Sequence, residues 1–313
     1  MLQAKHLLFI PLIIAATSFK PLPKSSGIAN KYPNDTGLAQ DPDVLYTEDF
    51  NDGLANIFGR YTDVKNREGM SLDTKDIPEG STTPALVITG KGGGVNDGGH
   101  LYKAFKVGFE GTVYLRYYVK YPASSKGYIH HESVWFGGYN PATTYPNPRA
   151  GICGLGDKRI SIAYEPVNAP NMDTYLYWGD MKNAQGRCWG NDMVNHSPTA
   201  QQLPWDKWMC VEVMVKLNNP VTATNGELKV WQDGKEVGHW GTGFPNGHWD
   251  ADSWINDPKE APFAGFKWRT DPNLNINYIW IEFYDDKSPA GQSHYIKYAN
   301  LVMARKYIGP IKK

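Results

Sequence analysis

The sequence lacks an excess of charge of either sign. Its 313 residues hold 32 Lys+Arg against 32 Asp+Glu, so the formal net charge is zero. Proteins that bind nucleic acids usually carry a strongly basic face, which attracts the phosphate backbone. Bulk charge therefore gives no reason to expect a nucleic acid partner, and any attraction for a charged ligand must come from a local site.

Cysteine is also scarce. Cys153, Cys188 and Cys210 allow at most one intramolecular disulfide, and no Cys-x-x-Cys or His-x-x-x-His spacing accompanies them to indicate a metal site. Cys153 and Cys188 are the favoured pair, because both lie near loops while Cys210 lies within a strand pattern. Three reduced and buried thiols are an equally good interpretation of the sequence.

A short hydrophobic run lies at the N-terminus. Lys5 and His6 precede the apolar residues 7–16, which is the layout of a secretory signal peptide. The run is too short to span a bilayer, although a membrane anchor is the competing interpretation. We therefore predict a signal peptide over residues 1–18, a flexible leader over residues 19–42, a secreted or periplasmic location, and no membrane contact after signal removal.

Helical periodicity and internal repeats are missing from the rest of the chain. Residues 43–313 show no Pro/Ser-rich break, so we predict one domain there. What recurs is an alternation of apolar and polar residues with period two, which is typical of half-buried strands. The alternation is clearest over residues 113–120, 159–165, 209–216 and 279–284. An Asp-Gly pair at residues 233–234 predicts a tight hairpin.

Two of the predicted strands carry polar and aromatic side chains on one face. From Arg159 to Glu165 every second residue is suited to a core, so Arg159, Ser161 and Glu165 point the other way. By the same rule Tyr175 and Tyr177 share a face. If these strands are neighbours, an arginine, a serine and two tyrosines line one wall, which is a composition suited to binding a sugar acid.

Four stretches occur in the same order as in a known group of enzymes. They are residues 113–121, 131–138, the strand at 160–161 followed by 175–177, and residues 208–234. Their order resembles the concanavalin A-like jelly-roll polysaccharide lyases, especially the alginate and glucuronan lyases of families 14 and 20. The resemblance implies an all-β fold in which residues 43–313 form a sandwich of two antiparallel sheets.

The resemblance also implies that an acidic, uronate-containing polysaccharide binds in a concave groove and is cut by β-elimination. That reaction needs a base for the proton α to the carboxyl, a group that stabilises the resulting negative charge, and an acid for the leaving oxygen. Tyr175 and Tyr177 match the paired tyrosines of the family, and Arg116 or Arg159 would lower their pKa values. His131, where the family has a lysine, is expected to be the partner base or to neutralise charge.

This chain departs from the family pattern at one further position. Ala163 stands where the family has an arginine, so we expect Arg159 or Arg149 to replace it. His130 alternates onto the face opposite His131, so His131 is the expected groove residue. The other expected substrate-binding residues lie on the same polar and aromatic faces. They are Arg116, Tyr118, Trp135, Arg149, Ser161, Trp280, Glu282 and Tyr284.

Two other functions remain open. A retaining glycoside hydrolase of this shape needs two carboxyl groups about 5 Å apart on one face. The corresponding Glu-x-Asp-x-Glu pattern does not occur, and Glu282 is the nearest candidate. A non-catalytic, lectin-like protein is also compatible with the 11 Trp and 19 Tyr, because such rings stack on sugars as well as fill cores.

A structural calcium ion is a further expectation. Glu48 and Asp52 place carboxylates beside a glycine turn, and the resembled jelly rolls often hold Ca²⁺, which takes six to eight oxygen ligands. A solvated acidic turn before a strand is the simpler interpretation. Catalysis in the resembled lyases would need no cofactor. The neutral charge demands no protein partner, so we expect a monomer that binds its polysaccharide.

Overall fold

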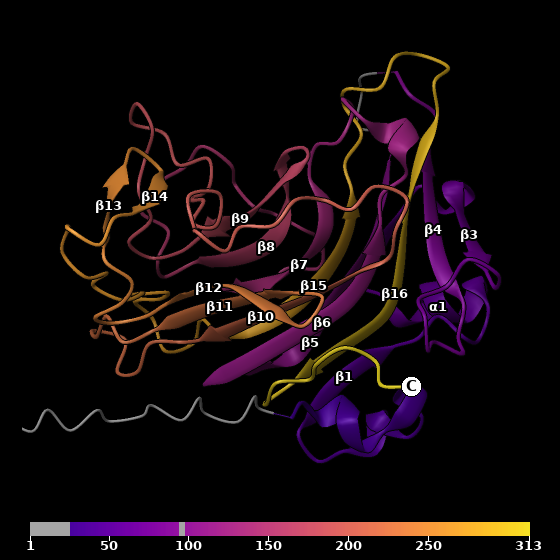
Figure 1. Ribbon diagram of the computed structural model, residues 1–313, viewed down its shortest axis with the longest axis horizontal. Helices are drawn as coiled ribbons and strands as arrows, with labels where there is room; N and C mark the ends of the chain where they lie inside the picture. The colour runs from indigo at the N-terminus through magenta and orange to yellow at the C-terminus, as the bar shows by residue number, and fades with distance from the viewer. Residues whose placement is uncertain (1–25, 94–97) are drawn as a thin grey trace, which may run out of the picture.

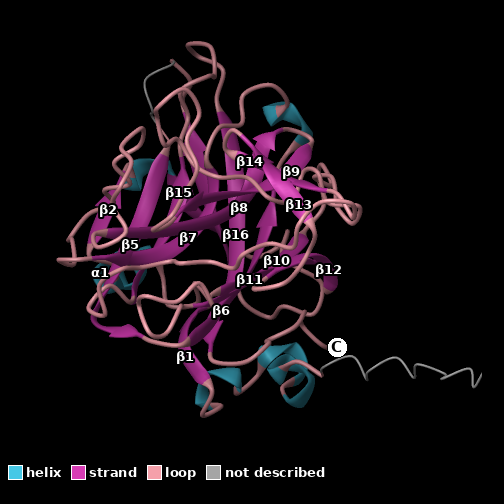
Figure 2. Ribbon diagram, turned by 90° about the vertical axis from the view of Figure 1, so that its left-hand side faces the viewer, coloured by secondary structure: helices cyan, strands magenta, loops and turns pink. Residues whose placement is uncertain are grey.

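The computed structural model describes residues 26–93 and 98–313, which fold into two large antiparallel sheets packed face to face (Figures 1 and 2). The first has eight strands in the order β12-β11-β10-β6-β16-β4-β3, with β1 paired to β16. The second has six strands in the order β2-β5-β15-β7-β8-β9. This is the all-β, concanavalin A-like jelly-roll sandwich predicted from the sequence.

The bounds of the elements are as follows. The eight-stranded sheet contains β1 (Val44–Glu48), β3 (Met70–Asp73), β4 (Ala85–Gly90), β6 (Thr112–Lys120), β10 (Met209–Lys216), β11 (Glu227–Gln232), β12 (Lys235–Trp240) and β16 (His294–Ala304). The six-stranded sheet contains β2 (Asp63–Lys65), β5 (Gly99–Phe109), β7 (Glu132–Tyr139), β8 (Arg159–Asn168), β9 (Asn171–Tyr177) and β15 (Ile276–Phe283). Outside the two sheets lie the hairpin β13 (Gly247–Asp250) and β14 (Ser253–Asn256), and the helix α1 (Leu54–Arg60).

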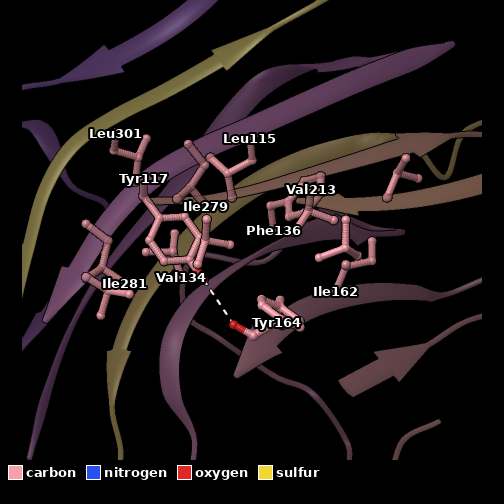
Figure 3. Close-up of a cluster of buried hydrophobic side chains, with 14 of the residues drawn as sticks. Leu115, Tyr117, Val134, Phe136, Ile162, Tyr164, Val213, Ile279, Ile281 and Leu301 are labelled. Carbon is pink, nitrogen blue, oxygen red and sulfur yellow. Dashed lines mark hydrogen bonds between the residues drawn. The ribbon is translucent and has the colours of Figure 1, made fainter. Parts of the chain in front are cut away.

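The hydrophobic core lies between the two sheets, and the alternation seen in the sequence assigns its residues correctly. Leu115 of β6 and Val213 of β10 face Phe136 of β7 and Ile162 of β8 (Figure 3). The Tyr117 hydroxyl also crosses the core, donating a hydrogen bond of 3.1 Å to the backbone carbonyl of Tyr164. Since the apolar faces meet here, the alternate residues of the six-stranded sheet point outward, where they form the site described below.

The Asp-Gly pair forms the predicted hairpin between β11 and β12. Gln232 pairs with Lys235, and both turn residues have positive φ, 51° at Asp233 and 73° at Gly234. Asp and Gly tolerate this left-handed conformation, which matches the twist of the flanking strands. The prediction of a tight turn is therefore confirmed.

The described part of the predicted leader, from residue 26 onward, packs on the rest of the chain. Residues 28–40 form three short 3₁₀ helices, Ile28–Lys31, Pro33–Asp35 and Leu38–Gln40, packed against the C-terminal segment (Figure 1). Ile28 and Leu38 are buried against Val302 and Ile308. A Pro- and Asn-rich composition suggested flexibility, but a few apolar side chains anchor the segment to the eight-stranded sheet.

Arg116 and Tyr118 also lie elsewhere than expected. Both belong to β6 of the eight-stranded sheet and point outward from it, where the terminal segments cover them. The Arg116 guanidinium is fully buried and pairs with Asp35 at 2.5 Å, and the Tyr118 hydroxyl accepts a hydrogen bond from the backbone N–H of Ile311. Alternation correctly placed both residues on the outward face of their strand, but it could not show which sheet the strand belongs to. Because β6 lies in the eight-stranded sheet, neither residue contacts the site.

The predicted signal peptide, residues 1–18, lies outside the described residues, as does the leader up to residue 25. Among the described residues, no helix is long and apolar enough to cross a membrane.

Candidate active site

A pocket of about 570 Å³ lies on the outward face of the six-stranded sheet. Strands β2, β5, β7, β9 and β15 supply its floor, and the loops after β7 and β9 supply one side. The lining residues are Lys65, His100, His130, His131, Trp135, Pro146, Pro148, Ala150, Tyr175, Tyr177, Trp189, Trp280, Glu282 and Tyr284. Seven of the residues expected from the sequence therefore lie together in this pocket. They are His131, Trp135, Tyr175, Tyr177, Trp280, Glu282 and Tyr284.

Aromatic rings form a continuous row along the floor of this pocket. The ring centroids of Trp280 and Trp135 are 5.7 Å apart, those of Trp135 and Tyr175 are 5.6 Å apart, and those of Tyr175 and Tyr177 are 5.5 Å apart. His100 extends the row at 6.1 Å from Trp280. Tyr175 lies edge-on to both Trp135 and Tyr177, while the two tryptophans are tilted by 35° to each other. Such a row offers apolar ring faces and edges against which a sugar can pack.

His131 is bound to a buried carboxylate. Its Nδ1 lies 2.7 Å from Oε1 of Glu165, a residue of β8 that is only 1% exposed. Burial disfavours the charged imidazolium, but the charge and the hydrogen bond of Glu165 outweigh it, so the pKa of His131 is raised above 6.5. Because Nδ1 is held by Glu165, the imidazole presents Nε2 as its other titrating atom.

His130 lies in the pocket too, contrary to the expectation that it faces away from it. His131 has a φ of 56°, and β7 begins only at Glu132, so the strand alternation does not extend back to the two histidines. Their ring centroids lie 4.2 Å apart, and Nδ1 of His130 is 2.8 Å from Oδ1 of Asp286. Burial, followed by the charge of His131, lowers the pKa of His130.

Tyr175 and Tyr177 share the face predicted for them, beside His131. The ring centroids of His131 and Tyr175 are 4.8 Å apart. Burial raises the pKa of both phenols, whereas the sequence analysis expected nearby positive charge to lower them. The hydrogen bond between the phenols raises the pKa of Tyr175 further. At Tyr177 the same hydrogen bond and the charge of Arg159 both oppose the rise in pKa. Both tyrosines are therefore protonated, proton-donating groups near neutral pH.

Arg159 lies beneath Tyr177 and does not line the pocket, which corrects its expected role as a carboxylate ligand. Its guanidinium carbon is 4.0 Å from the centroid of the Tyr177 ring. Its N–H groups donate to the backbone carbonyls of Pro148, Arg149 (2.8 Å) and Ile152 (3.0 Å). Burial lowers its pKa to about 10, so the group stays charged. Arg159 thus positions both the tyrosine and the loop after β7.

Ser161 and Arg149 do not line the pocket either. Ser161 is 1% exposed, and its hydroxyl accepts a hydrogen bond of 2.7 Å from the Tyr278 hydroxyl, so it supports the floor from below. Arg149 is exposed on the loop after β7, beside the lining residues Pro148 and Ala150. Neither side chain takes the place of the family's arginine at Ala163.

Glu282 is a largely buried acid in the pocket. Burial raises its pKa well above 4.5, the negative charge of Glu165 raises it further, and Lys65 lowers it. A carboxyl group with a raised pKa keeps its proton and donates a hydrogen bond instead of carrying a negative charge. Glu282 is therefore suited to receive a carboxylate of the ligand.

Four site residues were missed by the sequence analysis. Glu165 was placed on the outward face of its strand but was not predicted as a site residue. Its position four residues after Ser161, on the same face of β8, was the signal that could have identified it. Lys65 and His100 come together only through the β2–β5 pairing, in which they lie directly opposite each other. Trp189 lies in an irregular loop that offers no periodicity.

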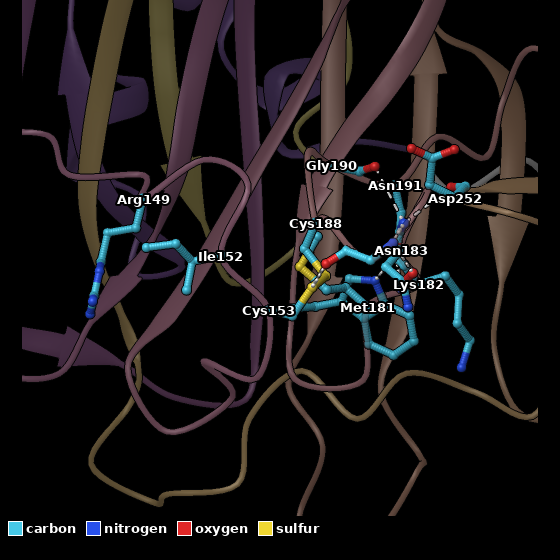
Figure 4. The surroundings of a disulfide bond; sticks show 12 residues. Arg149, Ile152, Cys153, Met181, Lys182, Asn183, Cys188, Gly190, Asn191 and Asp252 are labelled. Carbon is cyan, nitrogen blue, oxygen red and sulfur yellow. Dashed lines mark hydrogen bonds between the residues drawn. A yellow bond between two sulfur atoms is a disulfide. The ribbon is translucent and has the colours of Figure 1, made fainter.

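Two loops beside the pocket are joined by a disulfide between Cys153 and Cys188, the pair favoured from the sequence (Figure 4). One loop follows β7 and the other follows β9. The third cysteine, Cys210, is a buried thiol in β10, and burial raises its pKa to about 12. We call residues 146–153 and 187–190 the disulfide-tied wall of the pocket.

The predicted calcium ligands are brought together, but around a side-chain cation. The Arg60 guanidinium lies 2.7 Å from Oε1 of Glu48 and also pairs with Asp52. Over residues 26–93 and 98–313, no group of three or more His, Cys, Asp or Glu side chains is arranged to hold a metal ion. Arg60 thus pairs with both of the carboxylates that were expected to bind Ca²⁺.

Several solved structures with the same fold are of alginate lyases. The chain superimposes on alginate lyase vAL-1 from Chlorella virus with a TM-score of 0.52, at 17% identity over 84% of this chain and 99% of that one. Alginate lyase Aly36B gives a TM-score of 0.51, at 15% identity over 86% and 99% of the two chains. A variant of Aly36B solved with an alginate tetrasaccharide also gives 0.51, at 14% identity over 86% and 96%.

No protein-family model and no curated protein sequence matches the chain. The likeness to solved structures lies below 20% identity, and it shows the fold alone.

Proposed function

We propose that this protein is a polysaccharide lyase that binds an acidic, uronate-containing polysaccharide along the aromatic floor of the pocket and cleaves it by β-elimination. The observation that carries the proposal is the presence of the His131–Glu165 pair and the two phenols of Tyr175 and Tyr177 in one pocket. This combination offers a base and an acid to the same sugar. The fold shared with alginate lyases supports the choice of reaction.

His131 is the base of the proposed reaction. Glu165 fixes the imidazole through Nδ1, as the carboxylate does in a Ser-His-Asp triad, and leaves Nε2 to take a proton. The proton removed is the one α to the uronate carboxylate. Because Glu165 raises the pKa of His131, the imidazole is a stronger base than an isolated one, but it works only above that pKa.

Tyr177 is the acid of the proposed reaction, with Tyr175 as its hydrogen-bonded partner. As the α-proton moves to His131, a carbon–carbon double bond forms in the sugar ring and the bond to the leaving oxygen breaks. That oxygen takes the proton of Tyr177, whose raised pKa keeps it protonated beforehand. The phenolate left behind is stabilised by Tyr175 and by the Arg159 guanidinium. No water is consumed.

Glu282 fills the remaining role, which is to stabilise the uronate carboxylate while its α-carbon loses a proton. A protonated carboxyl donates a short hydrogen bond to a carboxylate without adding negative charge. Glu282 lines the same pocket as Tyr177 and His131, which supports its position near the reacting sugar. It takes the function that the sequence analysis gave to arginine.

The test is to incubate the protein with alginate, glucuronan and neutral β-glucans while measuring two products. Elimination creates unsaturated uronate ends that absorb ultraviolet light, and any chain cleavage creates new reducing ends. We expect both to rise on a uronate polymer and kcat to fall by about 10²- to 10⁴-fold in Tyr177→Phe, the range of one proton-transfer group. Tyr307→Phe, a half-buried phenol on the eight-stranded sheet, is the matched control.

Reducing ends without absorbance would contradict the proposal and indicate a hydrolase with Glu282 as its acid. Binding of the polymers without either product would indicate a lectin-like protein. The Cys153–Cys188 disulfide supports a further part of the proposal, export to an oxidising compartment, since such bonds persist there.

A further inference from the structure

We propose that the disulfide-tied wall is a separate binding subsite for a second acidic sugar of the polymer, formed by Trp189 and Arg187. The inference rests on the proposed function, because it names a neighbouring uronate of the same chain as the ligand. It assigns a function to a part of the molecule that the reaction described above does not use.

The exposure of Trp189 is the first argument. Its side chain is 43% exposed, one of the few large hydrophobic residues that the described chain leaves open to solvent, and it lines the pocket. Its ring packs on Gly151, where a Cβ would lie only 3.2 Å from the Cη2 atom of the indole. Gly151 therefore holds the ring flat against one loop while the opposite side stays accessible to a sugar ring.

Unpaired positive charge is the second argument. The Arg187 guanidinium carbon lies 5.7 Å from the centroid of the Trp189 ring, and the side chain is exposed. Arg149 is exposed on the facing loop. Among the described residues, neither arginine has a carboxylate within ion-pair distance, whereas each of the three histidines of the pocket has one. The wall thus offers an aromatic platform with cations at its edge, which complements a sugar that carries a carboxylate.

The rigidity of the wall is the third argument. Besides the disulfide, Gly151 donates a backbone hydrogen bond of 2.9 Å to the carbonyl of Cys188. Arg159 donates to three backbone carbonyls of the first loop. Asn191 of the second loop bonds the backbone of its own loop at Lys182 and that of the β13–β14 turn at Asp252. A platform fixed from both sides loses little conformational entropy on binding, so its contacts contribute more fully to affinity.

The wall is also joined to the proposed reaction centre. Gly190 follows Trp189 and lies so close to Tyr175 that a Cβ there would be 2.6 Å from the ring carbon Cζ. A sugar held on Trp189 therefore lies next to the sugar held at Tyr175 and His131. Two adjacent uronates would occupy the two places, and the substrate would be a polymer with contiguous acidic residues.

The experiment compares Trp189→Ala and Arg187→Gln with matched controls from elsewhere on the surface. Trp231→Ala removes a half-exposed tryptophan of the eight-stranded sheet that also has a cation, Lys229, over its ring at 5.2 Å. Arg67→Gln removes an exposed guanidinium that lies 5.4 Å from the Phe58 ring centroid. Affinity is measured by the retardation of each variant in gels containing alginate or glucuronan, all in the Tyr177→Phe background, whose slower turnover preserves the polymer during the run.

We expect Trp189→Ala to weaken retardation by about tenfold, Arg187→Gln by a smaller factor, and the two controls by less than twofold. In the active background, Trp189→Ala should raise KM on the polymer with little change in kcat, the signature of a contact made equally in ground and transition states. Reduction of the disulfide in the otherwise folded protein, followed by circular dichroism, should reproduce the increase in KM.

Equal retardation of Trp189→Ala and the wild type would overturn the subsite while leaving elimination intact. Retardation that depends on Trp189 without any unsaturated product would support the subsite and contradict the proposed reaction. If no acidic polymer is retarded at all, the subsite is wrong. The two proposals therefore fail on different measurements.

Discussion

Replacement of Glu165 by glutamine tests the proposed base directly. In the folded protein the Nδ1 of His131 lies 2.7 Å from the Glu165 carboxylate, which is 1% exposed. A hydrogen bond to a charged group contributes about 1.5–3 kcal/mol, and each 1.4 kcal/mol is a factor of ten in rate. We therefore expect kcat/KM of Glu165→Gln to fall by roughly 10- to 150-fold at its plateau.

Glu165→Gln should also shift the pH dependence of kcat/KM to lower pH. Glu165 holds the pKa of His131 above 6.5 against the opposing effect of burial, so kcat/KM should rise with pH through an inflection above 6.5 in the wild type. Without the carboxylate, burial remains and lowers the pKa of His131. The inflection of Glu165→Gln should thus lie below 6.5, and the assay is kcat/KM on a uronate polymer over a pH series.

The control is Glu227→Gln, which removes the carboxylate of a second His–Glu pair. There Nε2 of His239 lies 3.2 Å from Oε2 of Glu227, on the eight-stranded sheet and away from the pocket. It should leave both the plateau and the inflection unchanged. Two results for Glu165→Gln would refute the assignment of His131 as the base. One is a pH profile of kcat/KM whose acid inflection does not move, and the other is a plateau value of kcat/KM within twofold of the wild type.

Three further predictions concern contacts that hold the site or the N-terminal segment in place. Arg159→Met leaves three backbone carbonyls without a donor and should lower the free energy of unfolding by about 3 kcal/mol, measured by urea denaturation. Asp35→Asn leaves the buried charge of Arg116 without its partner and should lower the free energy of unfolding by about 3 kcal/mol in the same assay. It should not change kcat/KM, since the pair is remote from the pocket. Gly190→Ala should lower kcat about tenfold and also lower the thermal midpoint, because the added methyl displaces the Tyr175 ring and Gly190 has a φ of 147°. An unchanged midpoint of denaturation in the first two, or an unchanged kcat in the third, would contradict the contacts described here.

The parts of the structure that depend on local alternation could be predicted from the sequence. Period-two patterns identify the core side of β6, β8, β10 and β15, and they place Tyr175 and Tyr177 on one face. The same patterns carry no information on which strands share a sheet. For that reason Arg116, on the polar side of its strand, was assigned to the site although its strand lies in the other sheet.

The remaining errors come from backbone and packing effects beyond the strands. His131 has positive φ just before β7, so alternation misplaced its neighbour His130. Composition could not predict that three apolar side chains dock residues 28–38 on the sheet. Trp189 is held by a disulfide between two irregular loops, a contact that depends on tertiary structure alone.

The most direct test of the central claim is to digest a uronate polymer in water enriched in heavy oxygen and to weigh the products by mass spectrometry. Elimination consumes no water, so we predict products with an unsaturated end that are one water lighter than hydrolysis fragments and that carry no heavy oxygen before the reducing end exchanges with solvent. Products of the full hydrolysis mass, each with one heavy oxygen from the moment of cleavage, would show hydrolysis and contradict the assignment of His131 and Tyr177 as the base and acid of an elimination.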